Sequence, residues 1–343
     1  MSGPVATEDT PPAPAAPAPA TGHVVSLEPG RVTRVGSLPV RRVLPQRPRR
    51  TVGAWCFADH VGPIPVREAG AIGIGPHPHM GLQTVTWIVA GELLHRDSLG
   101  SEQLIRPGQL NIMTAGHGVA HAEEDPGLEA GELHAVQLWV AQPEGTRHGA
   151  PDFEHHADLP RLELQGARAT VLVGEFGGHE SPARHDTEHS GVEFILERPG
   201  VLLPLRPDHE HALVVIDGSV SVEGQAVEPG VLCYLGTGRS ECRLDVADPA
   251  RALLLGGVPF PEPVLMCGTS SPAPARRCPR PGANGRRTTD ASAPCGPRWN
   301  ELRSGRLLGS EPLVPRYHSP QPGGLTVPVT VRGSTGDRVW PAS

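Results

Sequence analysis

The amino-acid sequence predicts an all-β protein that contains two tandem jelly-roll β-barrels. Short apolar runs are separated throughout by Gly, Pro, Asn and Asp, and no long stretch shows the 3.6-residue period of an amphipathic helix. The same pattern of runs occurs twice, and many short strands at close spacing favour a sandwich or barrel. The length of 343 residues also exceeds what one hydrophobic core usually serves, so two domains are expected.

Residues 1–22 are predicted to form a disordered leader. Six of them are proline, set among alanines and threonines, so the segment cannot bury enough apolar surface to offset the entropy of ordering. It has neither the basic start nor the apolar block of a signal peptide, and no run elsewhere approaches membrane-spanning length. We therefore expect a cytoplasmic protein without a membrane anchor.

Residues 23–143 are expected to form the first barrel. The apolar runs Gln83–Ala90, Gln109–Met113 and Leu133–Val140 have the length and flanking turn residues of strands. In Leu133–Val140, apolar side chains occur on both alternating faces. This strand is therefore expected inside a sandwich, with both faces covered.

A polar connector is expected at residues 144–160, and a second barrel over residues 161–266. Runs such as Gly191–Glu197 and His211–Asp217 repeat the pattern of the first half, and each half has a His-x-His pair ahead of a strand. This recurrence indicates an internal duplication. The return segment at residues 236–242 contains no histidine, so the second barrel is expected to lack a metal.

Charge and cysteine usage exclude several classes of protein. The net charge is −7, and residues 1–266 carry 19 arginines against 33 acids, which argues against direct nucleic-acid binding by the main body. Cys56, Cys233 and Cys242 stand alone without CxxC spacing. They indicate neither a disulfide framework nor a zinc knuckle, and they agree with a reducing compartment.

Two pairs of residues have the spacing of metal ligands in a barrel. His77 and His79 are two residues apart, so in an extended segment both imidazoles leave the same face, and His121 with Glu123 repeats this geometry. A barrel that brings the pairs together gives three imidazoles and one carboxylate, which suits a divalent first-row ion. Iron is favoured, and zinc, manganese, copper, cobalt and nickel remain alternatives. Among 17 histidines, solvated pairs near turns are the simpler interpretation, and the complete set of four favours ligands.

Several motifs occur in a specific order between about Val24 and Met266. They are VGAWCF at 52–57, HPHMGLQTVTW at 77–87, RPG at 106–108, MTAG at 113–116, HAE at 121–123 and QLWV at 137–140. Together they resemble the pirin family of bicupins, which implies two tandem cupin domains of jelly-roll fold. The resemblance also implies that the amino-terminal cupin holds one ferrous ion (Fe2+) through the residues matching His77, His79, His121 and Glu123.

Three positions depart from the family pattern. Family members usually have Arg and Glu where this chain has Met80 and Gln83, and Arg where it has His117. The change at Gln83 alters the charge expected beside the metal, and Glu123 is expected to supply the carboxylate in its place. His117 is expected in an exposed loop, outside the set of ligands.

Other histidines and the large aromatic residues of the first barrel are expected to be structural. His60, His95 and His134 are near enough in sequence to orient a ligand. However, His95 is expected in a solvated or ion-paired turn, and His134 as a satisfied core histidine. Trp87 and Trp139 are expected to pack in cores.

Residues 267–343 form a basic, low-complexity tail with 11 arginines against four acids. The family resemblance stops at Met266. Reading the back-translated codons with a one-base offset permits the text Trp-Asn-Phe-Val-Ala-Arg-Thr that the family has there, so we predict a single-base frameshift near codon 267. The alternative is a disordered basic arm that binds acidic partners.

The resemblance implies a quercetin 2,3-dioxygenase-type oxidoreductase that acts on a flavonol or a similar chelating small molecule. Glu123 would then serve as ligand and as the base that accepts the substrate's hydroxyl proton. A non-enzymatic, iron-dependent redox sensor that binds a transcription regulator or a metabolic enzyme is the main alternative. A metal-free binding module is the third. We expect a monomer.

Overall fold

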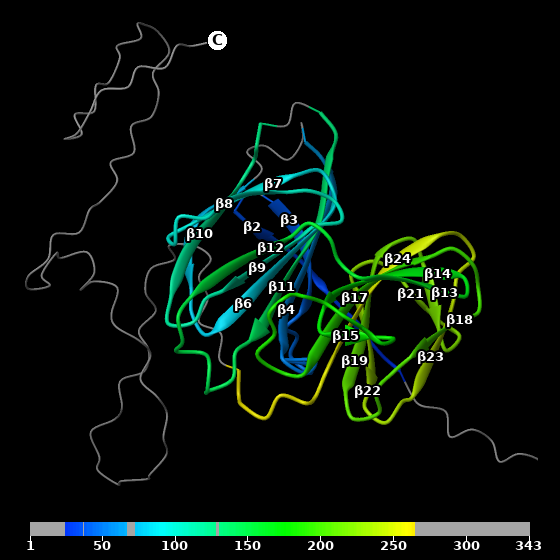
Figure 1. The fold of residues 1–343 in the computed structure, drawn as a ribbon. Coiled ribbons are helices and arrows are strands. Elements are labelled where there is room, and N and C mark those ends of the chain that lie inside the picture. The colour runs from blue at the N-terminus through cyan, green and yellow to red at the C-terminus, as the bar shows by residue number, and fades with distance from the viewer. Residues whose placement is uncertain (1–24, 37, 67–72, 128–129, 265–343) are drawn as a thin grey trace, which may run out of the picture. The chain divides into compact units, whose positions relative to one another are not determined.

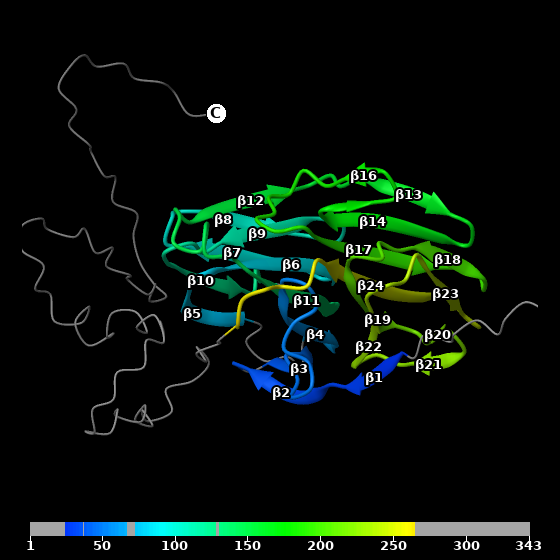
Figure 2. The same ribbon diagram turned by 90° about the horizontal axis from the view of Figure 1, so that it is seen from below.

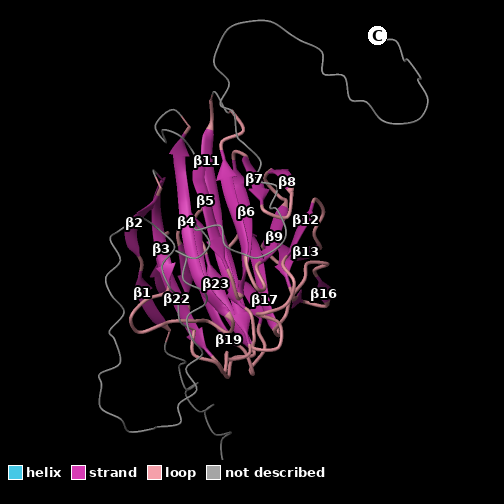
Figure 3. Ribbon diagram, turned by 90° about the vertical axis from the view of Figure 1, so that its left-hand side faces the viewer, coloured by secondary structure: helices cyan, strands magenta, loops and turns pink. Residues whose placement is uncertain are grey.

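The computed structural model describes residues 25–36, 38–66, 73–127 and 130–264. Every regular element in this part of the chain is a β-strand, and the 24 strands form two large and three smaller sheets (Figures 1 and 3). The prediction of an all-β, two-barrel protein is confirmed. The predicted leader at residues 1–22, the tail at 267–343 and the proposed frameshift lie outside the described residues. The described chain offers no helix with the length and apolar character needed to span a bilayer.

The first half consists of a seven-stranded antiparallel sheet and a four-stranded antiparallel sheet. The strands of the large sheet, in spatial order, are β12 (Asp152–His156), β9 (Leu110–Thr114), β6 (Leu82–Ala90), β11 (Glu132–Ala141), β4 (Trp55–Pro65), β3 (Leu38–Leu44) and β2 (Arg31–Val35). The strands of the small sheet are β5 (Gly73–His79), β10 (Val119–Glu124), β7 (Leu93–Asp97) and β8 (Glu102–Ile105).

The second half repeats this arrangement strand for strand, which supports the internal duplication. Its large sheet has the order β1 (Ser26–Pro29), β22 (Val231–Gly236), β19 (Glu210–Asp217), β24 (Ala250–Gly257), β17 (His189–Leu196), β14 (Ala167–Val173) and β13 (Arg161–Leu164). Its small sheet has the order β18 (Val201–Pro204), β23 (Glu241–Asp245), β20 (Val220–Val222) and β21 (Gln225–Val227). A separate ribbon joins β15 (Glu175–Phe176) and β16 (His179–Glu180).

Each large sheet is completed by a strand from outside its own barrel sequence (Figure 2). The strand β1 lies within the segment 23–143, yet it pairs with β22 of the second half. The strand β12 lies within the expected connector 144–160, and it pairs with β9 of the first half. Both additions cover edge strands whose backbone groups would otherwise be open to pairing with another chain.

A hydrophobic core shared by the two halves joins the barrels. It contains Val85, Val136 and Leu138 from the first half together with Val214 and Leu253 from the second. The face of β11 that carries Val136 and Leu138 is covered by this core, as its sequence predicted. The expectation that the opposite face is also fully covered is wrong, because Gln137 and Trp139 on that face are only half-buried and line a cavity.

Trp55 crosses from the first half into the second. Its indole N–H lies within hydrogen-bonding distance of two carbonyl oxygens of the second half, at 3.1 Å from Ser190 and 3.2 Å from Gly256. The ring packs so closely on Gly191 that a Cβ atom there would lie 2.9 Å from Trp55 Cζ2. The two halves are thus joined by a directional contact as well as by apolar burial.

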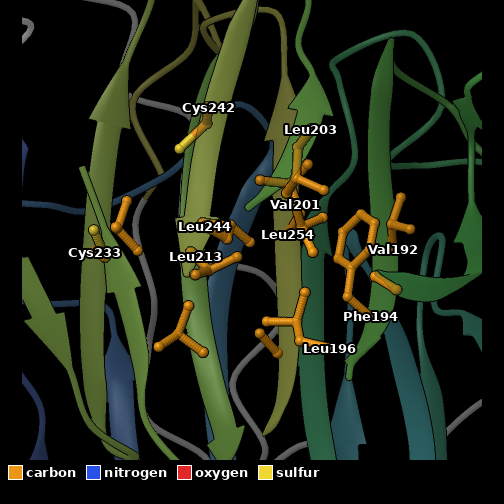
Figure 4. Packing of buried hydrophobic residues seen from close by; sticks show 14 of the residues in the cluster. Val192, Phe194, Leu196, Val201, Leu203, Leu213, Cys233, Cys242, Leu244 and Leu254 are labelled. Carbon is orange, nitrogen blue, oxygen red and sulfur yellow. The ribbon is translucent and has the colours of Figure 1, made fainter. Parts of the chain in front are cut away.

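The interior of the second barrel is filled by apolar side chains (Figure 4). Leu203 of β18 lies opposite Cys242 of β23, and Val201 lies opposite Leu244. These strands correspond in sheet order to β5 and β10, which carry the histidines of the first barrel. Aliphatic packing therefore occupies the space in which the first barrel collects polar side chains.

Three buried histidines outside the candidate site should make stability depend on pH. Burial lowers the pKa of His60, His189 and His211 from 6.5 to about 4. The unfolded chain then binds protons below about pH 6.5 that the folded chain binds only near pH 4. We expect the free energy of unfolding to be highest above pH 6.5 and to fall between pH 6.5 and 4, by up to about 1.4 kcal/mol per pH unit for each group.

Urea-unfolding midpoints at pH 7, 6 and 5 measure this dependence. The variant His211→Gln should show a shallower fall, while His148→Gln, at an exposed position, should follow the wild type. Equal slopes for all three proteins would show that His211 is not responsible.

Candidate metal centre

Three of the four predicted ligands meet on neighbouring strands of the first barrel. His77 and His79 lie on β5 and His121 lies on β10, where His121 is paired directly with His77. The ring centroids are 4.5 Å apart for His77 and His121, 4.8 Å for His77 and His79, and 5.0 Å for His79 and His121. One ring nitrogen from each lies within 4.8 Å of the other two.

Hydrogen bonds determine which nitrogen of each ring carries the proton. His77 Nδ1 is 2.9 Å from the carbonyl oxygen of Gly75 and must donate to it, so its Nε2 carries a lone pair. His95 Nε2 is 3.1 Å from the Asp97 carboxylate and donates to it, which leaves His95 Nδ1 as an acceptor. His121 Nδ1 lies 3.4 Å from that nitrogen and donates to it. The Nε2 atom of His121 therefore also carries a lone pair.

These two lone pairs face each other. His77 Nε2 and His121 Nε2 are 3.1 Å apart, and burial lowers the pKa of both rings, so both are neutral at neutral pH. Without a cation this approach is repulsive. Two nitrogens bound to one first-row ion at about 2.0–2.1 Å are themselves roughly 3 Å apart, so the spacing fits a shared ion.

His79 supplies the third nitrogen. Its ring is buried, its Nε2 has no hydrogen-bond partner among the described residues, and burial lowers its pKa to about 3. A buried imidazole nitrogen without a hydrogen-bond partner destabilises the folded protein unless an ion or a ligand binds it. The three rings together form a donor set suited to a divalent first-row ion.

Glu123 lies in the same cavity but outside the cluster of three nitrogens. It follows His121 by two residues on β10, and it accepts a hydrogen bond of 3.1 Å from the Thr86 hydroxyl. Burial raises the pKa of its carboxyl group to about 7. A carboxyl group beside the imidazoles therefore changes its charge near neutral pH.

The other histidines have the following surroundings. His95 is buried in β7, donates a hydrogen bond to the Asp97 carboxylate as a neutral ring and stacks on Phe153 at 4.3 Å, so the expectation of a solvated or ion-paired turn is wrong. His134 is a core histidine, as predicted, with its Nε2 atom 2.7 Å from His60 Nε2. His117 is exposed, also as predicted.

Two of the departures from the family pattern have clear positions. Gln83 is buried and donates hydrogen bonds to the Thr114 hydroxyl at 2.9 Å and to the Arg184 carbonyl at 3.3 Å. Met80 is 52% exposed. Through these hydrogen bonds, Gln83 of β6 connects to β9 and to the second half.

The histidines line a cavity of about 1020 Å³. Trp139 was expected to pack in a core, yet it is partly exposed to this cavity, stacks on Phe57 at 4.0 Å and lies 5.0 Å from the His79 ring. The signal that identifies it is alternation, because Trp139 shares a face of β11 with the polar residue Gln137. Trp87 lies in the shared core as predicted.

Two regions of the chain match protein-family models. Residues 37–140, which include all four candidate ligands, match Pirin, and residues 195–269 match the Pirin C-terminal cupin domain. The "Putative quercetin 2,3-dioxygenase PA1205" of Pseudomonas aeruginosa is 44% identical over 246 residues, which are 71% of this chain and 78% of that protein.

Two further proteins show the same likeness. A pirin-like protein of Caulobacter vibrioides is 35% identical over 66% of this chain and 80% of its own length. The crystal structure of quercetin 2,3-dioxygenase from Acinetobacter baumannii has a TM-score of 0.69 and 42% identity, covering 71% of this chain and 82% of that one.

Proposed function

The chain belongs to the pirin family, and from this premise we propose that its first cupin is a metal-dependent oxygenase site of the quercetin 2,3-dioxygenase type. The substrate would be a flavonol or another chelating small molecule. The observation that carries the proposal is the meeting of three neutral imidazoles, two with lone pairs only 3.1 Å apart, at the wall of a cavity that also contains Glu123.

We propose that His77, His79 and His121 hold the ion, with Glu123 as the adjoining carboxylate. Ferrous iron is the ion we favour, because reaction with dioxygen calls for a redox-active metal, although zinc, manganese, copper, cobalt and nickel suit the same donor atoms. When bound, the ion would supply Lewis acidity towards the substrate's chelating oxygens.

Glu123 is proposed as the catalytic base. Its carboxyl group is buried, and burial raises its pKa to about 7, so its carboxylate form can accept a proton near neutral pH. The Thr86 hydroxyl donates to Glu123 Oε1 and fixes the direction in which the carboxylate points. The proton would move from the substrate hydroxyl to a Glu123 oxygen.

The cavity walls would orient the substrate and exclude water. Trp139 and Phe57 form a stacked aromatic wall, and Val61 and Leu133 add aliphatic surface. A flat ring system can lie against this wall with its chelating edge directed at the histidines.

Oxygen uptake by the iron-loaded protein in the presence of quercetin tests this function. We expect uptake that depends on both iron and quercetin. A protein that binds iron but consumes no oxygen with quercetin or related flavonols would contradict the enzymatic role and favour the redox-sensing regulator.

Asp97 is expected to control metal affinity through His95. In Asp97→Asn, the side-chain amide can donate to His95 Nε2, which moves the His95 proton to Nδ1 and makes His121 Nδ1 an acceptor. His121 Nε2 would then carry a proton and lose its lone pair. We expect the affinity for Zn2+ to fall on the order of 10–100-fold, measured by calorimetric titration.

The control for this variant is Asp158→Asn, at an exposed position. It should bind Zn2+ like the wild type. Unchanged affinity in a folded Asp97→Asn protein would show that the chain of hydrogen bonds does not position His121.

A cytoplasmic location is part of the same proposal. Cys56, Cys233 and Cys242 are buried free thiols, and burial raises the pKa of each to about 12. Protonated, buried thiols of this kind suit a reducing compartment.

A further inference from the structure

Arginines line the part of the cavity formed by β2, β3 and the segment that follows β3. The cavity lining includes Arg31 and Arg34 of β2, Arg42 of β3, and Arg50. Asp59 and Glu123 are the carboxylates that line the cavity within the described part of the chain. The lining thus carries more positive than negative charge, although residues 1–266 are acidic as a whole, with 19 arginines against 33 acids.

A row of paired residues connects this part of the cavity with the candidate metal centre. Along successive strands of the large sheet, Arg31 is paired with Arg42, Arg42 with Asp59, Asp59 with Gln137, and Gln137 with Thr86. Paired residues point to the same face of a sheet. Thr86 holds Glu123 beside the histidines, so the row extends from the site to the edge strand β2.

The arginines of this region differ in how their charges are balanced. Arg42 forms two hydrogen bonds of 2.7 Å with the Asp59 carboxylate and lies over the Phe57 ring at 4.4 Å. Its charge is therefore balanced within the cavity wall. Arg31 and Arg50 are exposed, and no ion pair joins either of them to another residue within the described part of the chain, although Arg31 is close enough to Asp59 to favour its charged form. Their guanidinium groups are available to an anion that enters the cavity.

We propose that the substrate is an aromatic anion. Its ring would lie against the wall of Phe57 and Trp139, its chelating oxygens would face the histidines, and its carboxylate or comparable anionic group would face Arg31 and Arg50. The orientation at the histidines rests on the proposed function, whereas the recognition of the anion rests on the arginines and requires no metal.

The competing explanation is that arginines on an edge strand only discourage pairing with other chains. In that case their charge contributes to solubility and has no effect on ligand choice. The position of Arg31 in the row that leads to Thr86, and of Arg50 in the lining of the same cavity, favours recognition instead.

A matched pair of ligands tests the proposal. The probes are 3-hydroxyflavone and its 4′-carboxylate, which share the ring and the chelating oxygens and differ in one charge. Their fluorescence is titrated with the metal-free protein and with the zinc-loaded protein, which cannot oxidise them. The variants are Arg31→Gln/Arg50→Gln and, as control, Arg47→Gln, which removes an exposed arginine of the same segment that does not line the cavity.

We expect the wild type to bind the carboxylate about 10-fold or more tightly than the neutral flavone, and this preference to shrink at high salt. The double variant should lose the preference, and Arg47→Gln should keep it. Equal binding of both probes by the wild type, failure to bind either, or an unchanged preference in the double variant would overturn the proposal.

Failure of the proposed function has a different signature. A protein without a metal site would show no tighter binding of either probe after addition of zinc, yet the carboxylate preference of the metal-free protein would persist. The two ideas can therefore fail independently.

Discussion

Replacement of His121 by alanine is expected to abolish stoichiometric metal binding. His121 contributes one of three nitrogens, and its Nε2 atom lies 3.1 Å from His77 Nε2 with its lone pair held in place by His95. Loss of a direct ligand should cost more than loss of a residue that only orients one, so we expect affinity for Zn2+ or Fe2+ to fall on the order of 100-fold or more. Elemental analysis after dialysis and calorimetric titration both measure this.

The matched control is His117→Ala, which removes an exposed histidine four residues earlier. It should retain the metal content of the wild type. Since His121 is buried, the variant His121→Gln keeps most of the side-chain volume and separates loss of the ligand from loss of packing. A folded His121→Ala protein with unchanged metal content would mean that the ion binds elsewhere.

Glu123→Gln is expected to slow turnover strongly while leaving the three imidazoles able to bind metal. An amide keeps an oxygen that can accept the Thr86 hydrogen bond, but it cannot accept the substrate proton. General-base catalysis typically contributes 10²–10⁴-fold, so we expect kcat/KM for oxygen uptake to fall by roughly that factor.

The pH dependence of the rate provides a second test of the Glu123→Gln variant. The wild-type rate should rise with pH as Glu123 loses its proton and then become constant, since only the carboxylate is a base. Burial raises this pKa to about 7 in the free protein, and a bound cation would lower it. The Glu123→Gln protein should lack this rising limb.

Glu124→Gln is the control, because Glu124 is the neighbouring acid and pairs with Arg96 away from the histidines. It should leave both rate and pH profile unchanged. Full turnover by Glu123→Gln would exclude the base role, and loss of metal from the same variant would show that the carboxylate is needed chiefly as a ligand.

The barrels could be predicted because their signal is local. Alternating apolar residues and frequent turn residues specify strands, and the recurrence of the pattern reveals the duplication. The exchange of β1 and β12 between sequence segments could not be predicted in this way. It depends on which sheet edge is free to accept a strand, and that is decided only when the whole sheet has formed.

In the candidate site, too, the local spacing of residues was predictable and the contacts between strands were not. The two-residue spacing predicted that His77 shares a face with His79, because residues two apart in a strand share a face. That His121 meets them followed only from the expected barrel and from the resemblance to pirins, and the structure brings the three rings together. The link from Asp97 through His95 to His121 was missed. It arises from the register between β7 and β10, which pairs His121 with Asp97 across strands and has no signature in either strand alone.

Elemental analysis of the purified protein tests the central claim most directly. The three converging imidazoles predict about one first-row metal ion per chain, either as purified or after anaerobic reconstitution with Fe2+. The same measurement on His121→Ala should find almost none. A folded wild-type protein that is empty as purified and takes up neither Fe2+ nor Zn2+ would contradict the account.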